Sequence, residues 1–348
     1  ATPRFAVMRR RGWPRFWLGG PQPFLLWGGV LRTLAAGLTH ATAWRWRWAT
    51  PYHVGAPLIC VGNFTLGGGG KTPVVMLLAN KLRRHKPAIL SRGYGGRVRA
   101  PMRVAPAHRA RDVGDEACMM AAMLGEEIPI YVGANRRVSA RAAMAQGAQI
   151  LLMDDGLQNP TLAHTLNLAV VDQAVGLGNG RVLPAGPLRR PWMQDMAHTH
   201  ALLMVESAGG AHPSMRQLTQ RARARRLPIF HVRRRLRRLP FARNTPLYAF
   251  CGLAQPQKFF TALAAAGWAL AGEAAFPDHH VFTRRDARRL LADTAKHRAR
   301  LVTTEKDMVR LQTPPLSALA KATHACGEEL SVREDKKFWQ FIRQRLKT

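Results

Sequence analysis

The stretch over residues 58–73, LICVGNFTLGGGGKTP, decides the fold. A short apolar run, typical of a buried strand, leads into four glycines. Lys71 and Thr72 follow, and the apolar segment over 74–82 favours a helix. Backbone N–H groups of such a loop, together with the positive end of the helix dipole, bind phosphates. The strict pattern G-x-x-x-x-G-K-[ST] is not quite met, because its first glycine would fall at Thr65. The stretch still predicts an ATP or GTP site.

The glycine loop contains the first candidate residues for binding nucleotide and metal. The Lys71 ammonium is expected at the β- and γ-phosphates, and the Thr72 hydroxyl at Mg²⁺. A buried strand over 149–153 ends in Asp154 and Asp155, as in a Walker B strand, whose carboxylate faces Mg²⁺. We therefore predict Thr72 with Asp154 or Asp155 as the metal site. The predicted nucleotide-binding residues are Thr65, Gly67, Gly68, Gly69, Gly70, Lys71 and Thr72.

The charge of the chain is extreme and unevenly placed. The net charge is +33 over 348 residues. Residues 1–111 hold 19 Lys or Arg and no acid, and residues 207–272 also lack acids. Such a surface favours an anionic partner: nucleic acid, phospholipid or a phosphorylated substrate. Nucleotide bias in the genome is the alternative. The four cysteines lie far apart and imply no disulfide framework, which suits a reducing compartment.

The pattern of apolar runs predicts an α/β protein with a P-loop NTPase-type α/β/α core and a second, smaller α/β domain. We place a P-loop core domain at 51–228 and the smaller domain at 229–348, because eleven Arg and no acid occupy 215–243. The length allows each domain its own core. The further expected strands cover 88–90, 128–132, 166–171, 201–205, 247–253 and 301–303, and the further expected helices cover 138–146, 259–266 and 336–346.

Residues 1–50 form a basic, amphipathic segment of their own. Apolar residues recur at steps of three and four, and an alternation of Trp and Arg follows over 44–48. Pro23 and Arg32 bracket too few apolar residues for a membrane span, and Arg32 also argues against a signal peptide. This composition favours a helix lying on an anionic membrane surface. The alternative is a helix that packs on its own domain. The helical positions are Phe24, Trp27, Leu31, Leu34 and Leu38.

Several of these motifs, in this order, resemble one family closely: the tetraacyldisaccharide 4'-kinases of lipid A biosynthesis. The resemblance spans roughly residues 20 to 340. It rests on 61–65 with 67–73, 91–96 (SRGYGG), 114–117 (GDEA), 154–158 (DDGLQ), 178–180 with 183–189, Asp278-His279, and 304–307 (TEKD). Thr65 at the first P-loop position is what this family shows. Three positions depart from its pattern: the family usually has Thr at Gly69, His at Asn159 and Glu at Arg190.

The resemblance implies ATP- and Mg²⁺-dependent phosphorylation of a sugar hydroxyl on an acylated, already phosphorylated disaccharide. It implies a peripheral protein, expected to be a monomer, on the cytoplasmic face of the bacterial inner membrane. By resemblance Asp115 is the general base, paired with His279 and acting beside Lys71. From the residues alone, Asp115 and Glu116 could instead cap a helix N-terminus, and His279 could be a surface-loop histidine. Expected substrate contacts are Arg92, Tyr94, Glu116, Arg137, Gln158 and Asn179.

Two other classes of function remain open from sequence. One is a P-loop ATPase that switches conformation, and the other is a nucleic-acid-binding protein or polynucleotide kinase. No RNA-recognition, zinc-knuckle or helix-turn-helix pattern is evident, so no nucleic-acid partner is expected.

Overall fold

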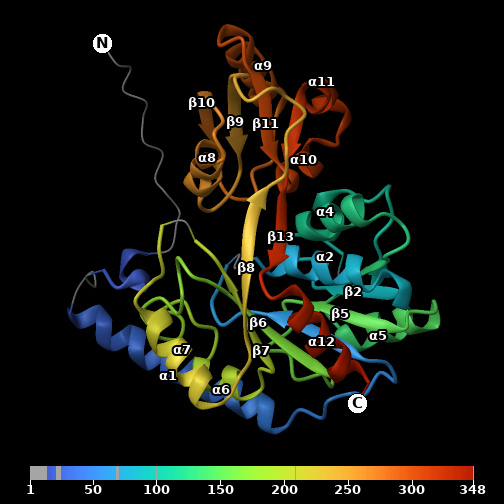
Figure 1. Ribbon diagram of the computed structural model, residues 1–348, viewed down its shortest axis with the longest axis vertical. Helices are drawn as coiled ribbons and strands as arrows, with labels where there is room; N and C mark the ends of the chain where they lie inside the picture. Colours follow the sequence, from blue (N-terminus) through green and yellow to red (C-terminus); the bar gives the residue numbers. More distant parts are fainter. Residues whose placement is uncertain (1–13, 21–24, 68–69, 99, 208, 348) are drawn as a thin grey trace.

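The computed structural model describes residues 14–20, 25–67, 70–98, 100–207 and 209–347. Helices and strands alternate along most of this chain, and the strands form two separate sheets (Figure 1). The predicted α/β class is therefore confirmed.

The larger sheet has nine strands in the order β13-β8-β7-β6-β1-β5-β2-β4-β3. The strands from β8 to β4 run parallel, whereas β3 and β13 are antiparallel edge strands. The central strands are continuous apolar runs, because helices bury both of their faces. Their bounds are β1 Leu58–Gly62, β2 Pro87–Ser91, β3 Met102–Arg103, β4 Ile130–Val132, β5 Ile150–Asp154, β6 Leu166–Asp172, β7 Ala201–Val205, β8 Ile229–Leu236 and β13 Glu328–Val332.

Two apolar clusters pack on the two faces of this sheet. One contains residues of α2 (Lys71–Lys81), α4 (Asp115–Leu124) and α12 (Asp335–Leu346). The other contains residues of α5 (Arg136–Ala145), α6 (Trp192–Ala197) and α7 (Ser214–Ala224). Helix α3 (Ala110–Val113) precedes α4, and the one-turn helix η2 (Arg83–His85) follows α2. The nucleotide-binding helix α2 is thus held from below by the sheet and from the side by α4 and α12.

The smaller sheet has four parallel strands in the order β10-β9-β11-β12. Helix α8 packs on one of its faces, and α9 with α11 packs on the other. The bounds are β9 Leu247–Cys251, α8 Pro256–Ala265, β10 Leu270–Ala275, α9 Arg284–Lys296, β11 Arg300–Thr304, α10 Glu305–Leu311, η3 Pro314–Leu316, α11 Ser317–Ala322 and β12 Thr323–Cys326.

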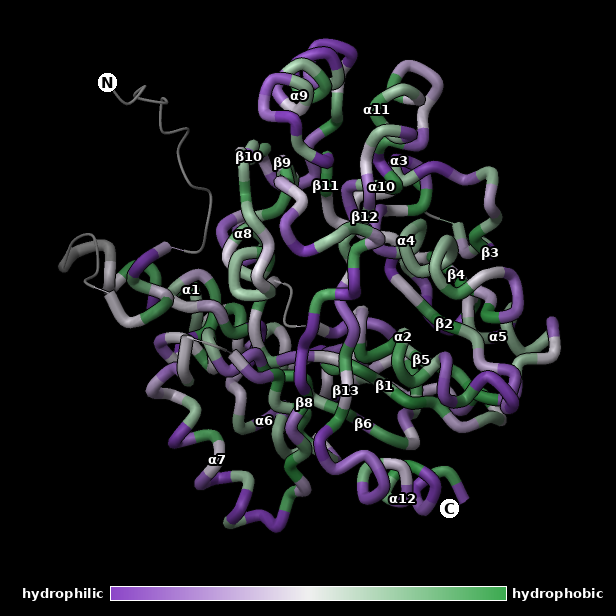
Figure 2. Tube along the Cα trace, turned by 45° about the horizontal axis from the view of Figure 1, so that its top comes forward, coloured by the Kyte–Doolittle hydropathy of each residue, from purple (hydrophilic) through white to green (hydrophobic). Residues whose placement is uncertain are grey.

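The chain passes from the larger sheet to the smaller one after β8 and returns to the larger one at β13. These two strands lie side by side (Figure 1). Both strands pair within the larger sheet, and α12 also packs there. The sequence-based boundary at residue 228 therefore does not coincide with the change of sheet, which falls between Leu236 and Leu247 and again between Cys326 and Glu328. The sequence of β8 explains the difference: only its first half has buried residues, Phe230 and Val232, and its second half is a run of arginines (purple in Figure 2) that does not look like a strand of a sheet.

Helix α1 (Leu25–Arg47) lies along one side of the larger unit, preceded by the short helix η1 (Arg15–Leu18) (Figure 1). Its outward residues include Val30, Leu34, Leu38 and Trp44, with Trp48 just after its end. Of the predicted apolar face, Phe24 and the Trp27 side chain lie outside the described residues, and Leu31 is half-buried. Within the described chain, no helix combines the length and apolarity that crossing a membrane requires.

Candidate active site

The glycine loop connects β1 to α2, as the sequence predicts. Gly67 and Gly70 adopt φ values of 93° and 86°, which favour glycine, and Gly70 immediately precedes α2. Lys71, the first residue of α2, is buried; its Nζ lies 3.1 Å from Asn63 Oδ1 and 3.3 Å from Asp155 Oδ1. The loop thus presents a fixed ammonium at a helix N-terminus, which is an anion site. The predicted ligands Gly68 and Gly69 lie outside the described residues.

Asp154 and Asp155 follow one another at the end of β5 but have different partners. The Thr72 hydroxyl donates to Asp154 Oδ2 at 3.3 Å, whereas Arg189 donates to both Asp155 oxygens at 2.9 and 2.8 Å. Burial, and then the charges of Glu116 and Asp155, raises the pKa of Asp154. Burial would raise the pKa of Asp155 as well, but Lys71 and Arg189 lower it on balance. Asp155 is therefore neutralised within the protein, and Asp154 is not.

The donors at this point fit a magnesium ion. Asp154 Oδ1 is buried and has no hydrogen-bond partner, and its other oxygen meets the Thr72 hydroxyl. Mg²⁺ prefers one or two protein oxygens, with waters and substrate phosphates completing its shell. Among the described residues no group of three or more His, Cys, Asp or Glu could hold a metal. A magnesium ion with only one or two protein ligands does not need such a group. Thr72 and Asp154 could hold the ion, with Asp155 committed to Lys71 and Arg189.

Asp115 is one of the points where the smaller unit contacts the larger one. It is the first residue of α4, and with Glu116 it puts acidic side chains in the first turn, where the helix dipole favours them, as the capping alternative expected; no side-chain hydrogen bond caps the helix, whose N-cap is Gly114. Instead, His279 Nδ1 lies 2.6 Å from Asp115 Oδ2, and Arg310 Nε donates to the same oxygen at 3.0 Å. Burial would raise the pKa of Asp115, but these hydrogen bonds and charges outweigh it and lower the pKa to about 2. Asp115 is therefore a carboxylate at neutral pH.

The backbone around Asp115 is arranged for this contact. Gly114 has a φ of 92°, and a Cβ there would lie 2.5 Å from the carbonyl oxygen of Tyr94. Only glycine lets the 93–96 turn pack so closely on the start of α4. His279 has a φ of 57°, which is rare for a residue with a side chain. The histidine is thus held in place by its loop rather than being a free surface residue.

Arg310 is a site residue that sequence reasoning missed. It lies on α10, and its Nη1 is 2.6 Å from Asp307 Oδ1. Asp307 is fully buried and accepts hydrogen bonds from the Thr304 hydroxyl and from the backbone N–H of Gly252. The TEKD motif therefore orients an arginine one helical turn further on. A cation three residues after a buried aspartate on a helix was the available signal.

The remaining predicted contacts divide into two groups. Tyr94, which is 74% exposed, has its ring 5.9 Å from that of His279. Glu116 lies close enough to Asp154 to raise the pKa of Asp154, and Arg92 close enough to Arg136 to lower the pKa of Arg136. These three therefore border the site.

The other three predicted contacts make hydrogen bonds within the protein. Arg137 donates to the carbonyls of Thr161 and Thr50. Asn179 donates to the carbonyls of Phe16 and Ala185 and so connects the loop over residues 178–189 to η1. Gln158 donates to the Asn63 carbonyl and to Asp195, both at 2.8 Å. Direct contact of Arg137, Gln158 and Asn179 with substrate stays a prediction.

Two of the positions that depart from the family pattern are also placed. Asn159 Oδ1 accepts from the backbone N–H and the hydroxyl of Thr161, so it stabilises a turn after β5. Arg190 is buried beside Asp195 and Trp46.

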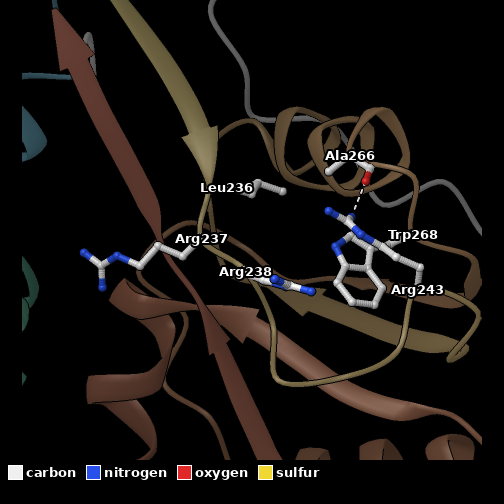
Figure 3. A pocket seen from close by; sticks show the side chains of 6 residues that line it. All are labelled: Leu236, Arg237, Arg238, Arg243, Ala266 and Trp268. Atoms are coloured by element: carbon white, nitrogen blue, oxygen red, sulfur yellow. Dashed lines mark hydrogen bonds between the residues drawn. The ribbon is translucent and has the colours of Figure 1, made fainter.

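Two cavities lie away from this site. One of about 240 Å³ lies where β8 approaches the smaller sheet, lined in part by Arg238, Arg243 and Trp268 (Figure 3). Arg243 donates to the Ala266 carbonyl and stacks on Trp268, so it serves the fold. The other, of about 920 Å³, lies between α12 and the end of α2. Neither Lys71 nor Asp115 is among their described lining residues.

The fold and site define a class. A parallel sheet with a glycine loop between a central strand and a helix, a lysine in that loop and a carboxylate paired with its threonine are the parts of a P-loop phosphotransferase. The family model described as tetraacyldisaccharide-1-P 4'-kinase (LpxK) matches residues 25–347. The chain belongs to this tetraacyldisaccharide 4'-kinase family. The resemblance drawn from the motifs is confirmed, and the comparisons favour it over a switch ATPase or a polynucleotide kinase.

Similar proteins agree over most of the length. The chain is 41% identical to a tetraacyldisaccharide 4'-kinase of Nitrobacter hamburgensis, covering 96% of this chain and 98% of that protein. It is 47% identical to the one of a Bradyrhizobium strain, over 74% of each. A crystal structure described as the "apo" form of LpxK from Aquifex aeolicus in complex with ATP has a TM-score of 0.70 at 23% identity, covering 90% of this chain and 97% of that one. This last likeness concerns the fold.

Replacing Arg310 tests the contact between the two units. Arg310→Met leaves the fully buried carboxylate of Asp307 without its cation. Removing one partner of a buried pair costs about 3–5 kcal/mol, which urea unfolding measures. Arg289→Met is the matched control, because its ion pair with Asp293 is exposed and should contribute less than about 1 kcal/mol. Equal losses in the two variants would contradict the role given to Arg310.

Proposed function

We propose that this chain transfers the γ-phosphoryl group of ATP to the 4'-hydroxyl of a tetraacyldisaccharide 1-phosphate, an acylated lipid A precursor. Family membership supports the acceptor. The observation that carries the reaction is the 3.3 Å hydrogen bond between Thr72 and Asp154, which joins the phosphate loop to the end of β5. Glu116, the residue after Asp115, raises the pKa of Asp154. The residues proposed to meet the sugar hydroxyl therefore lie near those proposed to bind ATP.

The protein's part is positioning and charge neutralisation, which is what phosphoryl transfer needs. Lys71 and the loop backbone hold the β- and γ-phosphates, and Asp155 with Arg189 holds Lys71 in place. Thr72 and Asp154 hold Mg²⁺, which when bound neutralises charge on the phosphates.

Asp115 accepts the proton of the attacking hydroxyl. Its low pKa keeps it ionised at neutral pH. His279 and Arg310 both contact Oδ2, and among the described residues none donates to Oδ1. That oxygen is therefore the one left to accept the proton. His279 comes from the smaller unit, so the base is assembled only where the two units meet.

Phosphoryl transfer tests the function directly. The expected result is passage of labelled γ-phosphate to a tetraacyldisaccharide 1-phosphate in detergent, with no transfer to RNA or DNA oligomers. Lys71→Ala should lower kcat by several powers of ten, because its ammonium meets charge on the transferring group. A tenfold loss is only about 1.4 kcal/mol of barrier, so a smaller loss in a folded variant would contradict the site.

The pairing of Asp115 with His279 predicts non-additive losses. Asp115→Ala should reduce kcat by about 10²–10⁴-fold with little change in the KM for ATP, since the base touches the acceptor. His279→Ala should do so more mildly, because it acts through Asp115. The double variant should resemble Asp115→Ala alone. Rates at saturating ATP decide this, and strict additivity would mean that His279 acts independently.

We also infer that α1 lies on the cytoplasmic face of the inner membrane and holds the protein there as a peripheral enzyme. Its outward residues are apolar where a surface helix would normally be polar: Leu34 is 55% and Trp44 is 67% exposed. Tryptophans beside arginines at its end match the composition of an interfacial helix. An acylated acceptor resides in such a membrane, so the location agrees with the reaction.

Vesicle binding tests this location. Leu34→Ser with Trp44→Ser should weaken co-sedimentation with anionic vesicles at least tenfold, because each exposed apolar side chain contributes about 1.5–3 kcal/mol when buried. Val138→Ser, at an exposed apolar position on α5, is the control and should bind as the wild type. Unchanged binding of the double variant would place the membrane surface elsewhere, such as the arginine-rich stretch over 215–243.

A further inference from the structure

The surroundings of Arg190 show what this arginine does. It is only 4% exposed although it follows a loop. Its guanidinium carbon lies 4.4 Å from the ring centroid of Trp46 on α1. The Trp46 ring is stacked on His198 at 4.9 Å, with an interplanar angle of 19°. Arg190 therefore packs on the inward face of α1 through a cation–π contact with Trp46, which a glutamate could not make.

On its other side Arg190 meets Asp195 of α6. Arg190 Nη1 lies 3.3 Å from Asp195 Oδ1, and Nη2 donates to Gln194 Oε1 at 3.1 Å. Asp195 is 1% exposed. A glutamate at position 190 would place like charges together here. A buried ion pair is by itself weak evidence of a gain in stability, and Arg190 Nε has no hydrogen-bond partner.

The contacts continue from Asp195 to the phosphate loop. Gln158 Nε2 donates to Asp195 Oδ2 at 2.8 Å and to the Asn63 carbonyl at 2.8 Å. The Asn63 side chain accepts from Lys71 Nζ at 3.1 Å and donates to the Gly67 carbonyl at 3.2 Å. An unbroken series of contacts thus joins the inward face of α1 to the ammonium that meets the phosphates.

We propose that Arg190 is a positioning residue that ties helix α1 to the phosphate loop, so that the placement of Trp46 sets the geometry in which Lys71 meets ATP. The inference rests on the nucleotide site proposed above. It makes the inward face of α1 part of the nucleotide site, while the outward face is the one proposed for the membrane.

The charge on Asp195 makes the role measurable. Burial raises the pKa of Asp195 to about 6, against the opposing hydrogen bond from Gln158 and the charges of Arg190 and Arg189. His198, at the end of the same helix, faces Arg190 and has a lowered pKa, mainly through burial. Loss of Arg190 removes a cation, so Asp195 should stay protonated to higher pH. Asp195, which accepts the hydrogen bond from Gln158, should then change its protonation state at a pH that an ATP-binding assay can reach.

The experiment measures ATP binding directly by calorimetry, with Mg²⁺ and without acceptor, alongside KM and kcat. Arg190→Met and Trp46→Leu should each raise the Kd and KM for ATP about fivefold or more, and the double variant should be no worse than Arg190→Met alone. In Arg190→Met the Kd should fall again between about pH 7 and 8.5, where the wild type is flat. Arg141→Met, an exposed arginine on α5, is the control and should bind ATP as the wild type does.

A lowered Tm with an unchanged Kd for ATP would make Arg190 a merely structural residue and overturn the inference. If Arg190→Met does not fold, Trp46→Leu carries the same test, since it removes only the ring. Arg190→Lys keeps the charge but not the planar stacking, so it should restore binding in part. Failure of the wild type to phosphorylate the glycolipid would overturn the proposed function instead, because ATP binding is read without any acceptor.

Discussion

The ion pairs of Asp155 with Lys71 and Arg189 hold the phosphate loop against the end of β5, and the rest of the site is built around them. Asp154, the residue before Asp155, instead accepts a hydrogen bond from the neutral Thr72 hydroxyl. Burial raises the pKa of both carboxylates. At Asp155 the charges of Lys71 and Arg189 outweigh burial, whereas at Asp154 the neighbouring carboxylates Glu116 and Asp155 add to it. Such a separation marks different tasks. Asp155 binds cations of the protein, and Asp154 is the carboxylate proposed to hold Mg²⁺.

The smaller unit contributes His279 and Arg310 to the site, and a buried aspartate orients the arginine. Asp307 orients Arg310, and Arg310 with His279 engages Asp115 on the larger unit. The proposed base and its partners therefore come from different units, and their contact exists only when the units meet. In the proposed reaction this contact completes the catalytic group.

Acidic residues are scarce in this chain, at 20 against 53 Lys and Arg. Asp115, Asp155, Asp195 and Asp307 each meet an arginine in the interior. The charges within the site are thus largely balanced, and the excess of +33 belongs to the surface. A positive surface attracts anionic lipid and a phosphorylated glycolipid alike. In the proposed function, the surface charge favours encounter with anionic lipid, whereas the paired aspartates lie inside the protein.

The sequence by itself determined the strand–loop–helix over 58–82, the central strands and the carboxylates at the end of β5, because each is encoded by neighbouring residues. Only the tertiary structure decided which carboxylate is free, since that depends on Arg189. It also brought Arg310 to Asp115 across 195 positions and assigned the arginine-rich β8 to the larger sheet. Contacts between distant residues follow from packing and register, which no local pattern records. Arg190 shows the limit most clearly: the sequence marked it as a departure, and only its neighbours Trp46 and Asp195 explain it.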